Sequence, residues 1–142
     1  MKSEETIDFH IRWAWYNISR MYNLKAGEFG GSMAIGYALL NIDRDGTPST
    51  KLAPKMGMEP RSLTRMIKNL DQNGLIQKVS DKSDKRLVKI FLTDKGKAVR
   101  AQAKQVVISF NKKIKEEIDS KELETCFSVL KKLNHLIDNN KI

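Results

Sequence analysis

Cysteine and histidine are scarce in this chain of 142 residues, which has one cysteine, Cys126, and two histidines, His10 and His135. A single cysteine excludes an internal disulfide framework and an all-cysteine zinc site. Two histidines far apart in sequence, with no glycine-rich phosphate loop, argue against an enzyme. The sequence therefore predicts no catalytic residue, no metal and no cofactor, and its cysteine usage favours a reducing cytoplasm.

Long hydrophobic runs are also lacking. No stretch approaches the roughly 18 to 20 apolar residues that a membrane helix needs. The polar, acidic residues 1–10 contain no apolar run of the kind that a secretory signal carries. With 40% hydrophobic and 30% charged residues, the composition is that of a soluble globular protein. We expect no membrane partner, and one domain, or one domain with helices that serve a partner.

Positive charge, by contrast, is in excess and concentrated. The chain has 26 Lys and Arg against 17 Asp and Glu, a formal net charge of +9. Residues 50–100 hold 13 of the basic and only 5 of the acidic side chains, so nearly all of the excess lies in the middle third. Such a field favours a polyanion as partner, and a merely basic surface is the alternative.

Helical periodicity fills both ends of the chain. Apolar residues at steps of four and three predict a first helix over about 7–21, broken by the glycines that follow. Ser32 is expected to cap a second helix that ends near Asp45 and Gly46. After residue 93 the pattern predicts two more helices, with Asp119 at the start of the last one, in a capping box with Glu122.

The middle segment predicts a helix–turn–helix. A short helix over about 50–56, with Ser49 or Thr50 as its cap, is closed by Gly57. Pro60 then opens a second helix, because its missing N–H costs nothing in the first turn, and Gly74 ends this helix. A short helix, a tight turn and an amphipathic helix in this order pack at a steep angle.

The second helix of this pair has one apolar and one basic face. Leu63, Met66, Ile67 and Leu70 recur at helical spacing, and the opposite face holds three cations with no acid among them. Arginine can bind guanine N7 and O6 together, while serine and threonine reach phosphates or base edges. A basic solvated helix is the alternative. The residues expected to contact DNA here are Pro60, Arg61, Ser62, Thr64, Arg65 and Lys68.

Two strands are predicted after this helix, over 75–80 and 86–93, joined by a polar turn. A two-stranded ribbon with a basic tip can lie along the DNA backbone and enter the minor groove. We expect Asp84 to hold Arg86 by a charge-assisted hydrogen bond and so to aim it. An ordinary hairpin turn is the alternative. The residues expected to contact DNA here are Lys82, Ser83, Asp84, Lys85 and Arg86.

These residues together resemble the MarR family of bacterial transcription regulators (multiple-antibiotic-resistance type). The likeness is sharpest over residues 63–76 and in the pattern Asp-x-x-Asp-x-Arg, supplied by Asp81, Asp84 and Arg86, before a strand that ends in Leu-Thr. It implies a mainly α fold with a small β-hairpin wing: a single MarR-type domain over 1–142, with a winged helix–turn–helix over 32–96 and dimerisation helices over 5–25 and 97–140.

The resemblance also implies a function. Family members usually repress genes from palindromic sites on double-stranded DNA as homodimers, and many release DNA when a small aromatic or phenolic effector binds. On the first helix, Arg20 can pair with a carboxylate and the neighbouring aromatic rings can stack. The candidate effector residues are therefore His10, Trp13, Tyr16 and Arg20, and packing of a dimer interface is the alternative role for these aromatic residues.

Three positions depart from the family pattern. Pro54 lies inside the short helix, where it removes a backbone donor and is expected to shorten or kink it. Ser83 stands at the wing tip where many members carry arginine, so insertion into the minor groove falls to Lys82. The cysteine of the family's peroxide sensors is missing from the first helix, and we interpret Cys126 as a thiol packed on the apolar side of the last helix.

The sequence therefore predicts a sequence-specific DNA-binding transcription regulator, a ligand-responsive repressor that acts as a homodimer. The alternative is a winged-helix scaffold for protein complexes without specific DNA binding. Such a scaffold has no need of three exposed arginines, Arg61, Arg65 and Arg86, on the surfaces that would face a DNA groove.

Overall fold

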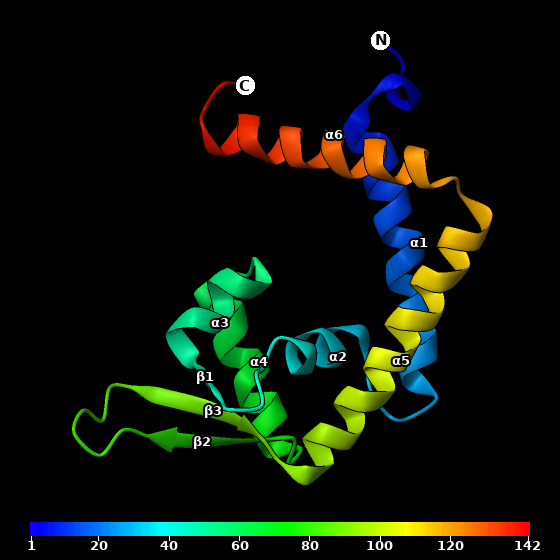
Figure 1. Cartoon of the computed structure of the whole chain (residues 1–142). Helices are drawn as coiled ribbons and strands as arrows, with labels where there is room; N and C mark the ends of the chain where they lie inside the picture. Colours follow the sequence, from blue (N-terminus) through cyan, green and yellow to red (C-terminus); the bar gives the residue numbers. More distant parts are fainter. The chain divides into compact units, whose positions relative to one another are not determined.

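The computed structural model describes all 142 residues and contains six α-helices, one 3-10 turn and three short strands (Figure 1). The predicted mainly helical fold with a small wing is confirmed. None of the helices combines the length and the apolar character needed to cross a membrane. In chain order the elements are η1 (Ser3–Glu5), α1 (Ile7–Gly27), α2 (Met33–Leu40), β1 (Thr47–Pro48), α3 (Ser49–Met56), α4 (Pro60–Gln72), β2 (Ile76–Ser80), β3 (Val88–Leu92), α5 (Asp94–Glu117) and α6 (Ser120–Asp138).

Two compact units make up the chain, Met1–Val106 and Val107–Ile142, and the boundary falls within α5. The first unit holds α1 to α4, the three strands and the start of α5. The second holds the rest of α5 and α6, and none of the residues of α6 is buried.

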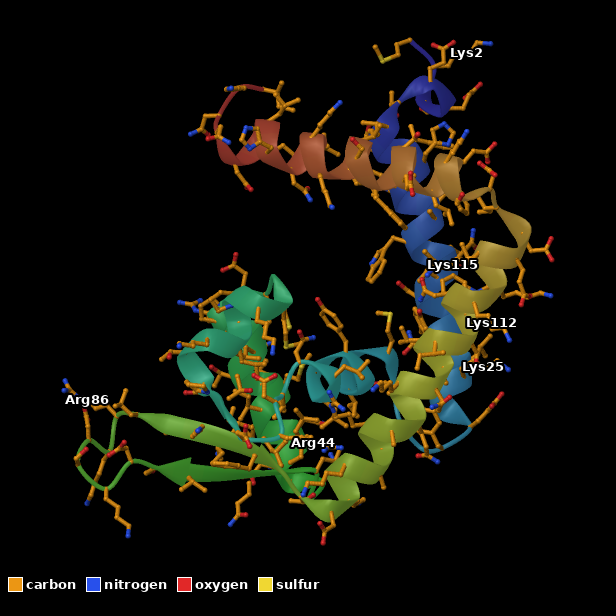
Figure 2. The ribbon with its side chains drawn as sticks, in the orientation of Figure 1. Lys2, Lys25, Arg44, Arg86, Lys112 and Lys115 are labelled. Carbon is orange, nitrogen blue, oxygen red and sulfur yellow. The ribbon has the colours of Figure 1, made fainter.

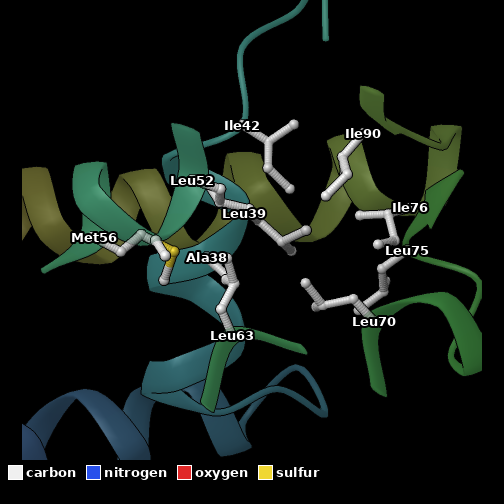
Figure 3. Packing of buried hydrophobic residues seen from close by; sticks show 11 residues of the cluster. Ala38, Leu39, Ile42, Leu52, Met56, Leu63, Leu70, Leu75, Ile76 and Ile90 are labelled. Atoms are coloured by element: carbon white, nitrogen blue, oxygen red, sulfur yellow. The ribbon is translucent and has the colours of Figure 1, made fainter. Parts of the chain in front are cut away.

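The hydrophobic core lies in the first unit, between residues 38 and 90 (Figure 3). Its members come from α2, the connection after it, α3, α4 and the sheet, so the helix–turn–helix and the wing share one core. Removal of this apolar surface from water is the main force that holds α4 against the other elements. The largest fully buried side chains are Leu39, Ile42, Leu52, Leu70 and Ile90.

The apolar face predicted for α4 is confirmed. Leu63 and Leu70 are buried, and the partly buried Met66 and Ile67 pack against the same cluster. Because these side chains fix the rotation of α4 about its helix axis, they also determine which of its residues face the solvent.

The sheet is antiparallel with the strand order β1-β3-β2. In the hairpin, Ile76 pairs with Leu92 and Ser80 pairs with Val88. The sequence predicts only a connection before α3, but Thr47 pairs with Ile90 and forms the third strand, β1. Pro48, the other residue of β1, has no N–H to donate, and it is tolerated because this strand lies at the edge of the sheet.

Several predicted helix ends are confirmed. Ser32 caps α2, since its Oγ accepts a hydrogen bond from the Ile35 N–H at 3.2 Å. Gly57 and Gly74 follow α3 and α4 with φ angles of 64° and 68°, in the left-handed region that glycine favours. Asp119 caps α6 by accepting from the Lys121 N–H at 3.0 Å, but the predicted capping box with Glu122 does not form.

Two other predicted ends are wrong. Helix α2 ends at Leu40 rather than near Asp45, because the buried Ile42 reaches the core from the connection and not from the helix. Neither Ser49 nor Thr50 caps α3: both belong to the helix, and its N-cap is Pro48, which has no side-chain acceptor. Pro54 lies inside α3, which continues to Met56.

A close joint connects the end of α4 with the start of α5. The Thr93 hydroxyl donates to the Gly74 carbonyl oxygen at 2.6 Å, and the Thr93 N–H donates to the Leu75 carbonyl oxygen at 3.1 Å. The α5 backbone approaches so closely that a Cβ atom on Gly96 would collide with the Leu75 oxygen. The position of the α4 C-terminus is therefore tied to the first turn of α5.

Candidate nucleic-acid interface

The exposed face of α4 carries the residues that the sequence singled out. Pro60 occupies the first turn of the helix, and all six predicted contact residues of this helix are exposed, on the side away from the core. The Thr64 hydroxyl donates its proton within the helix, to the Pro60 carbonyl oxygen at 2.9 Å. Its oxygen can still accept a hydrogen bond. The exposed cations on this face are Arg61, Arg65 and Lys68.

These three cations of α4 make no salt bridge or side-chain hydrogen bond within the chain. Lys55 of the neighbouring α3 differs, since its Nζ donates to the Asn41 carbonyl oxygen at 2.9 Å and to Asp43 Oδ1 at 3.1 Å. The positive charge of α4 is thus not neutralised internally. Unpaired guanidinium and ammonium groups on one helical face are suited to bind phosphates and the acceptor edges of bases.

The predicted contact between Asp84 and Arg86 at the wing tip is confirmed. Arg86 Nε and Nη2 donate to Asp84 Oδ1 and Oδ2, each at 3.1 Å, and the Arg86 backbone N–H donates to Oδ1 at 3.0 Å. These bonds to the Arg86 side chain and backbone lower the pKa of the Asp84 carboxyl below its ordinary value. The Arg86 side chain remains 90% exposed at the loop end of the hairpin (Figure 2). One edge of its guanidinium group contacts Asp84, and the other N–H groups can donate to a further partner.

Asp81 orders the rest of the turn, a role that the sequence reasoning missed. Its Oδ1 accepts from the Ser83 N–H at 2.8 Å, from the Ser83 hydroxyl at 2.6 Å and from the Asp84 N–H at 3.3 Å. These hydrogen bonds lower the pKa of Asp81, the Ser83 side chain contributing most. The signal was present in the Asp-x-Ser spacing, which is typical of an Asx-turn. Ser83 therefore directs its hydroxyl proton inward, while Lys82 and Lys85 stay exposed.

A further pair of charged residues, also missed, lies between α4 and the wing. Lys78 Nζ of β2 is 3.5 Å from Asp71 Oδ2 of α4, and both side chains are about half exposed. They border a shallow open concavity whose other lining residues include Thr64 and Lys68 of α4. The predicted DNA-contact set contains Thr64 and Lys68 but neither member of this pair.

The four candidate effector residues lie along α1 and are all exposed. Three of them form a row: the rings of Trp13 and Tyr16 meet edge to face at 5.8 Å, and the Arg20 guanidinium lies 5.6 Å from the Tyr16 ring centre. His10 is connected to this row through Phe9, whose ring lies 5.4 Å from the His10 ring and 6.3 Å from the Trp13 ring, and the His10 Nε2 lies 2.8 Å from the Glu4 carbonyl oxygen. An aromatic row that ends in a guanidinium suits an aromatic carboxylate.

The interpretation of Cys126 as a packed thiol is wrong for this chain. Cys126 is exposed in the single chain, as is its neighbour Phe127.

Comparison with known proteins shows what this geometry is similar to. The MarR family model matches residues 39–88, which include α3, α4 and most of the hairpin. Among solved structures, the S. aureus MepR–DNA complex is similar with a TM-score of 0.85 at 18% identity, over 93% of this chain and 98% of that one.

Two further structures share the fold. A cysteine-to-serine mutant of E. coli MarR complexed with operator DNA matches with a TM-score of 0.78 at 23% identity, over 87% of this chain and 89% of that one. CouR from Rhodococcus jostii RHA1 bound to p-coumaroyl-CoA matches with a TM-score of 0.80 at 20% identity, over 94% of both chains. At these identities the structural likeness establishes the fold.

Residues 39–88 match the MarR family model, and the chain has the fold of MarR-type winged helix–turn–helix transcription regulators. The family is not enzymatic, in agreement with the sequence-based expectation.

Proposed function

We propose that this protein is a sequence-specific, ligand-responsive repressor that binds palindromic double-stranded DNA as a homodimer in the cytoplasm. The observation that carries the proposal is the exposed face of α4, where Arg61, Arg65 and Lys68 lack partners and the core holds the helix from behind. Helix α4 occupies the major groove and the tip of the β2–β3 hairpin occupies the adjacent minor groove.

Within this arrangement the residues divide by task. Arg65 and Arg61 read base edges, since a guanidinium can satisfy both acceptors of guanine. Ser62, Thr64 and Lys68 bind the sugar–phosphate backbone beside the helix. At the wing, Lys82, Lys85 and Arg86 act through phosphates or the negative potential of the minor groove, with Asp84 holding Arg86 in place.

The homodimer rests on apolar surface that the single chain leaves uncovered. In α6, Phe127, Val129, Leu130 and Ile137 are all exposed, with Phe127 53% accessible. Exposed apolar surface of this kind marks a protein–protein interface. Trp13, Trp15 and Tyr16 of α1 are exposed as well, so α1 offers a second contact surface.

The aromatic residues of α1 support a response to an effector. The row formed by Trp13, Tyr16 and Arg20 supports a small aromatic effector that carries a negative charge, with His10 nearby in sequence. CouR, which shares the fold, has been solved with p-coumaroyl-CoA bound, an aromatic acyl thioester with phosphate groups.

Selection from random DNA tests the proposal. Wild-type protein is used to enrich duplexes from a random-sequence library, and fluorescence anisotropy then compares the enriched duplex with a scrambled duplex of the same composition. A repressor of this class enriches a palindrome and binds it at least 10³-fold more tightly than the scrambled duplex, the lower end of the usual specificity ratio. Equal weak binding to both would favour the scaffold alternative.

A further inference from the structure

The concavity between α4 and β2 contains one basic residue, Lys78, to which the proposed contacts assign no role. It opens to solvent on the outer side of α4, and its floor includes the partly buried Ile67. Strand β2 brings Lys78 to one side and α4 brings Lys68 to the other. The lining residues are Thr64, Ile67, Lys68, Asp71, Gln72 and Lys78.

Duplex geometry indicates what passes over this concavity. With α4 in the major groove and the hairpin tip in the neighbouring minor groove, one sugar–phosphate strand separates the two elements. The base of the hairpin packs against α4 through the shared core (Figure 1). The sugar–phosphate strand therefore has to cross the surface between the hairpin and α4. That surface is the concavity lined by Lys68 and Lys78.

We infer that this concavity, the strand seat, binds a backbone phosphate of the DNA strand between the two grooves, with Lys78 as a phosphate ligand outside α4 and the wing tip. The inference rests on the proposed DNA binding. A lysine is suited to this contact because its ammonium group is a flexible point charge that needs no fixed approach. Thr64 and Gln72 line the same surface and are both polar.

Asp71 competes with the phosphate for Lys78. Its carboxylate makes one long contact with Lys78, 3.5 Å between half-exposed groups. A solvated pair of this kind contributes little to stability, so it does little to order the lysine, whereas the full negative charge of Asp71 stays close to any phosphate in the seat. Lys78 therefore exchanges a weak internal partner for a phosphate when DNA binds, and Asp71 weakens binding to every sequence alike.

Lys78→Gln tests the seat, with Lys104→Gln as the matched control, because Lys104 is an exposed lysine of α5 that does not line the concavity. Affinity is measured by anisotropy over a range of salt concentrations, on the duplex enriched by the wild-type protein and on its scrambled counterpart. Lys78→Gln is expected to weaken binding to both duplexes by the same factor and to lower the slope of log K against log salt by about 0.9 per protomer. Lys104→Gln and the charge-preserving Lys78→Arg should keep the wild-type slope.

Replacement of single phosphates by neutral methylphosphonates locates the contact. Each phosphate of the enriched duplex is replaced in turn, and the loss of affinity is compared between wild type and Lys78→Gln. We expect one phosphate between the two grooves whose replacement weakens the wild-type protein but has no effect on Lys78→Gln. Equal sensitivity of both proteins at every phosphate would overturn the seat.

Asp71→Asn measures the competition. It should tighten binding to both duplexes, and this gain should shrink in the double variant with Lys78→Gln, because the freed lysine accounts for part of it. Weaker binding by Asp71→Asn would show that Asp71 orders Lys78 rather than competing for it. Arg65→Ala separates the seat from the proposed function: if Arg65→Ala loses discrimination while Lys78→Gln keeps the wild-type slope, only the seat is wrong.

Discussion

Asp84 and Asp71 each lie beside a cation on the basic surface, but the number and length of their contacts with that cation differ. Asp84 receives three hydrogen bonds from Arg86, one of them from the backbone, whereas Asp71 has a single contact of 3.5 Å with Lys78. Charge-assisted bidentate pairs fix geometry, and single solvated pairs do not. Removal of the two carboxylates should therefore change DNA affinity in opposite directions.

Asp84→Ala is expected to weaken DNA binding severalfold although it raises the net charge by one, because Arg86 loses the partner that orients it. Arg86→Ala should weaken binding more, since it leaves the Asp84 carboxylate facing the phosphates. Anisotropy on the enriched duplex at several salt concentrations measures both. Tighter binding by Asp84→Ala at every salt concentration would show that bulk charge, rather than orientation, governs the wing.

The turn should depend on pH through the same carboxylates. Hydrogen bonds lower the folded-state pKa of both Asp81 and Asp84 below 3.8. A depressed carboxyl pKa contributes order that is complete above the unfolded-state pKa and is lost as the pH falls through the folded-state value. The turn should stay ordered at neutral pH and loosen only below about pH 3.8. Carboxyl carbon shifts in an NMR titration measure this, and midpoints at or above 3.8 would contradict it.

Arg65 should supply discrimination between sequences. Arg65→Ala is expected to cost roughly 1 to 3 kcal/mol per half-site on the enriched duplex and to relax base preference at one position, the usual range for a base-reading arginine. Binding to the scrambled duplex should fall much less. If the ratio of the two affinities does not change, Arg65 contacts phosphates only.

At the scale of elements, the joint between α4 and α5 depends on a residue without a side chain. Gly96→Ala would place a Cβ atom against the Leu75 carbonyl oxygen, and a backbone atom cannot move aside as a flexible side chain can. We expect a loss of about 1 to 3 kcal/mol in the free energy of unfolding, as for other overpacked sites.

Gly27→Ala is the matched control for this joint, because no atom lies within 4 Å of the added Cβ at the end of α1. Its stability should be unchanged or slightly raised, since alanine is the better helix former. Urea unfolding of both variants measures the difference. Equal stability of the two would show that α5 can shift away from Leu75 at little cost.

Elements with a long periodic pattern could be predicted from the sequence, and elements defined by their neighbours could not. Helix α4 has four apolar residues at helical spacing and a glycine after its end, so its face and extent follow from the chain alone. Strand β1 has two residues and no period; only its pairing with Ile90 makes it a strand. The predicted end of α2 was wrong because an apolar residue can be buried from a connection as well as from a helix, and Ile42 is buried after the helix has ended.

The contacts of the candidate interface can be divided in the same way, into those that follow from sequence spacing and those that depend on packing. Asp84 and Arg86 are two residues apart, so a local turn brings them together and the contact could be predicted from their spacing. Asp71 and Lys78 lie on different elements, and their contact depends on how β2 packs against α4. Cys126 was misjudged because an apolar neighbour indicates burial only when another surface is present to cover it.

At the scale of the whole molecule, the protein should be a homodimer in solution. Light scattering at micromolar concentration is expected to give twice the mass of one chain. In such a dimer the two recognition helices should lie about 34 Å apart, which is one turn of DNA. Phe127→Ser should shift the equilibrium toward the monomer, because this ring is 53% exposed in the single chain and its burial would stabilise the dimer. A stable wild-type monomer would contradict the dimer.

The short strand β1 also determines where this protein can change in evolution. It pairs with β3 opposite Lys89 and Ile90 and goes no further toward the turn, so the tip between Ser80 and Val88 lies beyond the third strand and outside the core. Insertions and deletions in that segment would lengthen or shorten the reach of the hairpin while the base stays paired. Divergence in minor-groove contacts can therefore arise at the tip with little cost in folding.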